Sequence, residues 1–82
     1  MNNSFYNDFA ARFAASTLTS LVESFNSQVG NRGFTSARAA HNKALIDEFV
    51  RRGIDVSAVF DGTAISFAHH VELDNNSLVI RK

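Results

Sequence analysis

The sequence predicts an α+β fold, in which two N-terminal helices pack on one face of a C-terminal three-stranded antiparallel β-meander. Two observations lead to this prediction. Apolar residues recur at helical spacing over residues 4–29 and 36–52. The last third of the chain then contains two pairs of hairpin-forming residues, Asp61-Gly62 and Asn75-Asn76. The expected order is ααβββ, or ααββ if the first strand is absent, in a single small domain over residues 1–82.

The first predicted helix covers residues 4–29. Ser4 is a suitable N-cap because its hydroxyl can accept a hydrogen bond from the first turn, and Gly30 is a suitable end. Several poor helix formers cluster between Ser16 and Ser20, so the helix is either continuous or broken there. The stripe that defines it consists of Phe9, Phe13, Leu18, Leu21, Val22, Phe25 and Val29.

The second predicted helix covers residues 36–52, with Thr35 or Ser36 as its N-cap and Gly53 as its end. Its first half is rich in Ala and polar residues, and its second half is apolar. The expected buried face consists of Leu45, Ile46, Phe49 and Val50.

The predicted meander follows from turns at Asp61-Gly62 and Asn75-Asn76, which fix the register by counting. Ala58 then lies opposite Ile65, Val71 opposite Ile80 and Leu73 opposite Leu78, while Val59 points to the open face. Alternatively, Asp55 caps a short helical turn, so that residues 55–60 are not a strand and one C-terminal hairpin remains. The helix-facing set is Ile54, Val56, Ala58, Phe60, Ile65, Phe67, Val71, Leu73, Leu78 and Ile80.

The charge distribution and the amino-acid composition indicate where the protein is found and which segment is basic. The formal net charge is zero, but residues 30–53 contain five basic and two acidic residues, a local charge of +3. The chain has no Cys, which fits a reducing cytoplasm, and we see neither a signal peptide nor a membrane span. We therefore expect a cytoplasmic protein whose middle segment is its most basic part.

A candidate site for an anion or a nucleic acid lies in that middle segment. The loop 30–36 leads into a helix start, where unpaired amides and the helix dipole favour anions. The same residues also fit a tight interhelical turn with a capping hydroxyl. The order helix–helix–hairpin resembles that of winged-helix DNA-binding domains, in architecture alone, and the resemblance implies that helix 36–52 contacts DNA. The candidate binding residues are Arg32, Arg38, His41, Asn42 and Lys43.

Other polar residues have structural explanations. Arg51 and Arg52 end a helix, four residues after Asp47 and Glu48, so ion pairs within the helix are expected. Neighbouring strand residues point to opposite faces, so His69-His70 cannot hold one metal ion, and we expect His69 to be partly buried. We expect no metal, no cofactor and no catalytic residues.

The sequence favours a small non-enzymatic interaction module that binds a protein partner or self-associates. The alternative is a nucleic-acid or phosphate-binding domain that uses the loop 30–36 and the first half of helix 36–52. Steep salt dependence of binding is characteristic of this alternative, because phosphate contacts release counterions.

Overall fold

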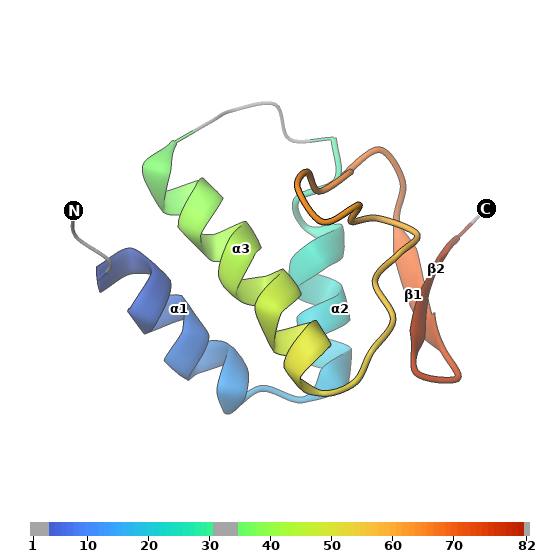
Figure 1. Ribbon diagram of the computed structural model, residues 1–82, viewed down its shortest axis with the longest axis horizontal. Coiled ribbons are helices and arrows are strands. Elements are labelled where there is room, and N and C mark those ends of the chain that lie inside the picture. Colours follow the sequence, from blue (N-terminus) through green and yellow to red (C-terminus); the bar gives the residue numbers. More distant parts are fainter. Residues whose placement is uncertain (1–3, 31–34, 82) are drawn as a thin grey trace.

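The fold is α+β, with three helices followed by one antiparallel hairpin (Figure 1). The structure is a computed structural model that describes residues 4–30 and 35–81. Helix α3 packs against both α1 and α2, and the hairpin lies beside α2. The elements are α1 (Ser4–Ala14), α2 (Leu18–Asn26), α3 (Ser36–Arg51), β1 (Val71–Asp74) and β2 (Ser77–Ile80).

The first predicted helix is broken, which confirms one of the two alternatives. Thr17 has an extended backbone (φ −75°, ψ 160°), and its hydroxyl accepts a hydrogen bond of 3.1 Å from the Ser20 amide. It is therefore the N-cap of α2. The Ser16 hydroxyl donates to the Arg12 carbonyl at the end of α1. In this segment, hydroxyl side chains thus bond to main-chain groups that would bond to other main-chain groups in a continuous helix.

Helix α3 has the predicted caps. The Thr35 hydroxyl accepts a hydrogen bond of 3.0 Å from the Arg38 amide. Gly53 (φ 79°) follows the helix, and the amides of Gly53 and Ile54 donate to Val50 and Phe49 in the pattern of a Schellman motif. The predicted buried face is wrong at Val50, which is 54% exposed.

The C-terminal hairpin has the predicted register, with Val71 opposite Ile80 and Leu73 opposite Leu78. Asn75 and Asn76 have φ angles of 49° and 65°. Positive φ at both positions is what a two-residue type I′ turn requires, and Asn accepts it better than most residues.

The prediction of a three-stranded meander is wrong, because residues 54–70 form no ladder. The Asp55 carboxylate accepts a hydrogen bond of 2.8 Å from the Ser57 amide, and the next residues form a turn in which the amides of Val59 and Phe60 donate to the Val56 carbonyl. This is the alternative in which Asp55 caps a short turn. Side-chain capture of a local amide thus replaces strand pairing here.

The first predicted hairpin also fails. The Asp61 carboxylate accepts from the amides of Thr63 and Ala64, and an isolated bridge joins Phe60 to Ile65 instead of Ala58 to Ile65. Since the residues do not alternate as in a strand, Ala58 is exposed and Val59 is buried.

The hydrophobic core receives residues from every element. It is centred on α3, the buried stripe of α2 and the inner face of the hairpin. Its members are Phe13, Leu21, Phe25, Ala44, Leu45, Ile46, Phe49, Ile54, Val56, Val59, Val71 and Leu78.

Glu48 is the one buried charged residue among those described, at 5% exposure. Its carboxylate accepts from Arg51 and from Arg52, each at 2.5 Å. Arg52 continues the chain of contacts, because its guanidinium donates to the carbonyls of Phe13 (2.9 Å) and Ser16 (2.7 Å) at the end of α1. One guanidinium therefore joins the end of α3 to the break between α1 and α2.

We predict that Arg52→Met lowers the free energy of unfolding by about 2 to 3 kcal/mol, because it leaves the Glu48 carboxylate and the α1 carbonyls short of a buried donor. Arg51→Met is the matched control. The Arg51 side chain is 63% exposed, so its loss should lower the free energy of unfolding much less than the loss of Arg52. Urea unfolding followed by circular dichroism measures both. Equal losses in the two variants would contradict this role of Arg52.

We also predict that Glu48 contributes to acid sensitivity. Burial of its carboxylate opposes ionisation, but hydrogen bonds from Arg51 and Arg52 outweigh burial and hold the pKa below its usual value of 4.5. A lowered pKa stabilises the fold above the unfolded-state pKa, and this contribution is lost as the pH falls through the folded-state pKa.

Glu48→Gln should accordingly be less stable than the natural chain at about pH 7, and the difference should shrink by about pH 3. Urea unfolding at the two pH values measures this. A difference that stays constant or grows as the pH falls would contradict the prediction.

Candidate functional site

The predicted anion site begins with Arg32 and Arg38. Arg32 lies outside the described residues. Arg38 is half-buried in the first turn of α3, and its Nε donates a hydrogen bond of 2.8 Å to the Gln28 side chain. Its guanidinium is therefore directed towards the residues that follow α2.

His41 and Asn42 come next on α3. The His41 ring packs edge-on against Phe9 and Phe13 of α1, with centroids 5.0 and 5.2 Å apart. Its Nδ1 lies 2.9 Å from Asn42 Oδ1. His41 thus fills part of the α1–α3 contact, where an aromatic side chain adds packing.

Lys43 lies near α1 as well. Its ammonium donates to both carboxylate oxygens of Asp47, at 2.9 and 2.8 Å, and lies 6.0 Å from the centre of the Tyr6 ring. The Tyr6 hydroxyl donates to the same carboxylate. Burial opposes ionisation of Asp47, but the hydrogen bonds from Lys43 and Tyr6 prevail and lower its pKa.

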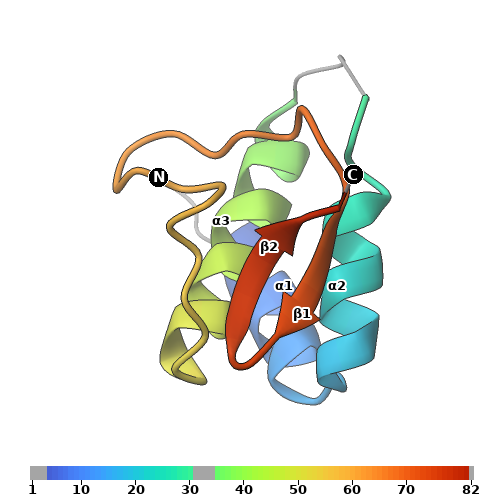
Figure 2. The ribbon, with the colours of Figure 1, turned by 90° about the vertical axis from the view of Figure 1, so that its right-hand side faces the viewer.

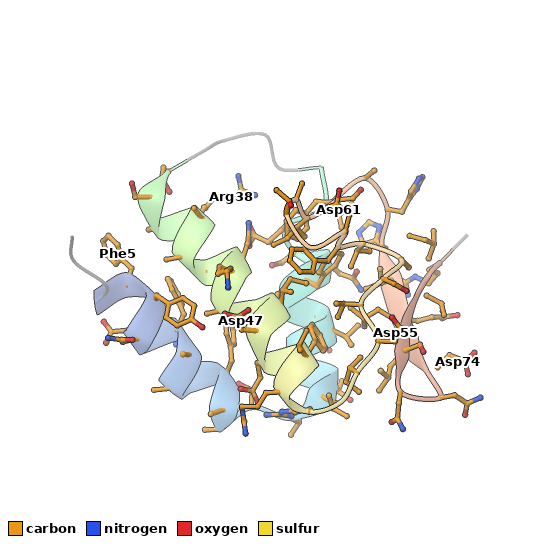
Figure 3. The ribbon with its side chains drawn as sticks, viewed as in Figure 1. Phe5, Arg38, Asp47, Asp55, Asp61 and Asp74 are labelled. Carbon is orange, nitrogen blue, oxygen red and sulfur yellow. The ribbon has the colours of Figure 1, made fainter. Side chains whose placement is uncertain are left out.

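The described candidates therefore do not gather at one point. Arg38 is near the start of α3 and bonds to Gln28, whereas Lys43 bonds to Asp47 in its second half (Figure 3). His41 is engaged by aromatic rings of α1. Binding of an anion or nucleic acid by this set remains a prediction, and the geometry supplies no convergent cluster for it.

The other charged residues behave partly as expected. Glu48 pairs with Arg52 four residues on, as predicted, but Arg51 bonds to Glu48 and Asp47 bonds to Lys43. His69 and His70 are both exposed, so the expected burial of His69 is wrong. Within residues 4–30 and 35–81, no three potential ligands gather as they would around a metal ion, and no helix has the length and hydropathy to cross a membrane.

The structure instead reveals a groove between α2 and β1, with a volume of about 460 Å³. In Figure 2, β1 lies between β2 and α2. The groove is lined by residues of α2 and of β1. Leu73, which was predicted to be covered by helices, is 37% exposed here. We call this feature the α2–β1 groove; it is lined by Leu18, Thr19, Val22, Glu23, Asn26, Val71, Glu72, Leu73 and Arg81.

Asn26 closes one end of the α2–β1 groove. Its side-chain amide donates to the Val71 carbonyl (3.0 Å) and accepts from the Val71 amide (2.8 Å). This pair of hydrogen bonds imitates a neighbouring strand at that position and joins the last residue of α2 to the first residue of β1.

The lining combines an apolar floor with a charged margin. Leu18, Val22, Val71 and Leu73 supply the floor, and Glu23, Glu72 and Arg81 the charges. A concave site of this kind suits an apolar side chain flanked by polar groups. Sequence reasoning missed the site because its two walls lie 45 residues apart at the Asn26–Val71 contact. The apolar residues Leu18 and Val22 on one stripe of α2 were the available signal.

Comparisons of the chain with protein-family models, with curated proteins and with solved structures found no match.

We predict that Asn26→Ala lowers the free energy of unfolding by about 1 to 2 kcal/mol, because two half-buried hydrogen bonds to Val71 are lost. Hydrogen exchange of the hairpin amides should accelerate with it, since β1 loses its attachment to α2. Asn42→Ala is the control, because the Asn42 side chain contacts the neighbouring His41 rather than the hairpin. Hairpin protection that is equal in both variants would refute the role assigned to Asn26.

Proposed function

We propose that this protein is a small non-enzymatic interaction module that binds a protein partner in the α2–β1 groove. The observation that carries the proposal is Leu73, an exposed large apolar side chain on a strand edge beside a concave, largely apolar surface. Exposed apolar side chains at a groove are typical of protein interaction sites, whereas scattered ones need no explanation.

Self-association is the other form of this proposal, and the same residues would carry it. The nucleic-acid alternative has weaker support. Lys43 is paired with Asp47, Arg51 and Arg52 with Glu48, and the α2–β1 groove carries two carboxylates. Phosphate binding requires cationic side chains that replace the counterions of the phosphates. Because these cations are already paired with carboxylates, the arrangement favours a protein partner.

We predict that Leu73→Thr reduces capture of the partner about five- to thirtyfold, since a truncated apolar anchor at an interface costs about 1 to 2 kcal/mol. Val50→Thr is the matched control, because Val50 is an exposed apolar residue on α3 that does not line the groove. Quantitative capture from the native cell, with sedimentation analysis of the purified protein, separates a foreign partner from self-association. Equal capture by the two variants would reject the groove as the binding site.

A further inference from the structure

We propose that the occupant of the α2–β1 groove is an extended peptide segment of basic character, which adds to the edge of β1 as a strand. This inference rests on the proposed function and specifies the partner's chemistry. Side chains of the added strand would alternate, with apolar residues directed towards α2 and Lys or Arg on the outer face of the hairpin.

The main chain of Leu73 provides the attachment point. In an antiparallel pair, main-chain groups point alternately towards and away from the partner strand. The amide and carbonyl of Val71 bond to Asn26, so they point away from β2, and those of Leu73, two residues on, point the same way.

The opposite strand confirms this direction. Leu78, which faces Leu73, donates its amide to the Asp55 carbonyl at 2.9 Å, on the far side of β2 from β1. Leu73 and Leu78 therefore form a non-hydrogen-bonded pair of the antiparallel ladder. The Asp55 amide also donates to the Asn76 carbonyl, so residue 55 already occupies part of the β2 edge. At β1, Asn26 occupies only Val71, and within residues 4–30 and 35–81 the main chain of Leu73 has no partner across this edge.

The charged residues along β1 favour a positively charged occupant. Glu72 and Asp74 lie on the outer face of the strand, on either side of Leu73, and both are exposed. Asp74 lies by the turn of the hairpin (Figure 3). Glu23 adds a carboxylate on the α2 side, and Arg81 is the one cation among the lining residues that the structure describes. Cross-strand neighbours of opposite charge stabilise a sheet, so an added strand gains from Lys or Arg beside Glu72 and Asp74.

The same charges disfavour other occupants. Two copies that paired β1 with β1 would bring their own Glu72 and Asp74 side chains together, and like charges across strands are destabilising. A helix would leave the main chain of Leu73 without a partner. Nucleic acid would be repelled by the carboxylates. A basic extended segment alone satisfies the apolar floor, the strand edge and the charge.

The test uses the full chain and a defined probe, the capped pentapeptide Lys-Val-Lys-Val-Lys, in a ¹⁵N–¹H NMR titration. We expect shifts at the amides of Leu73, Val22 and Thr19. Two control peptides should bind at least about fivefold more weakly: Glu-Val-Glu-Val-Glu, which reverses the charge, and a version N-methylated at both Val, which cannot donate to a strand.

A pair of protein variants tests the charge. Glu72→Lys should weaken binding of the basic peptide about fivefold and strengthen binding of the acidic one. Asp8→Lys makes the same change of charge on the exposed surface of α1, outside the groove, and should leave both affinities within about twofold.

The outcomes separate the two proposals. The inference is wrong if peptides shift the groove amides with affinities that do not depend on peptide charge, on Glu72→Lys or on N-methylation. Binding in the groove would then still stand. The same holds if neither peptide shifts the groove amides while partner capture still depends on Leu73. If capture is indifferent to Leu73→Thr, the proposed function itself fails.

Discussion

The buried carboxylate of Glu48 is the constraint on which the arrangement of the helices depends. A carboxylate at 5% exposure is stable only with charged donors, and Arg51 and Arg52 provide them. Once Arg52 is held there, its guanidinium reaches the carbonyls at the end of α1, where an unpaired helix terminus needs donors. The break between α1 and α2 is thereby fixed in place, and α2 runs back along α3 to the position where Asn26 meets β1.

Local chemistry explains the parts of the fold that the sequence predicts well. Asn75-Asn76 forms its turn with φ angles that few other residues accept, and the hairpin register follows from that turn. Thr35 and Gly53 likewise act within a few residues of their own positions. The break at Thr17 was one of two alternatives, because a threonine hydroxyl can either cap a new helix or lie on the surface of a continuous one. Nothing local decides between them, and a distant contact from Arg52 supports the broken form.

The failures have the opposite cause. Alternation over residues 54–67 predicted two strands, but Asp55 and Asp61 bind nearby amides and turn the chain before it can pair. Short apolar segments do not distinguish a strand from a turn whose apolar side chains are buried, as Val59 shows. The candidate site was missed for a related reason. Leu73 was predicted to lie on the helix-covered face of a three-stranded sheet, but it is 37% exposed and lines the α2–β1 groove.

An exposed strand edge is a hazard as well as an opportunity, because it can pair with another copy of the same chain. Here the edge of β1 is short, and Asn26 already occupies Val71, so among the residues that the structure describes only Leu73 is left without a partner at this edge. Glu72 and Asp74 flank that position with negative charge. Charges of this kind commonly prevent edges from pairing with themselves, and they also select a partner strand of opposite sign. The same two carboxylates can thus oppose pairing between copies of the chain and, in the proposed complex, select a basic strand.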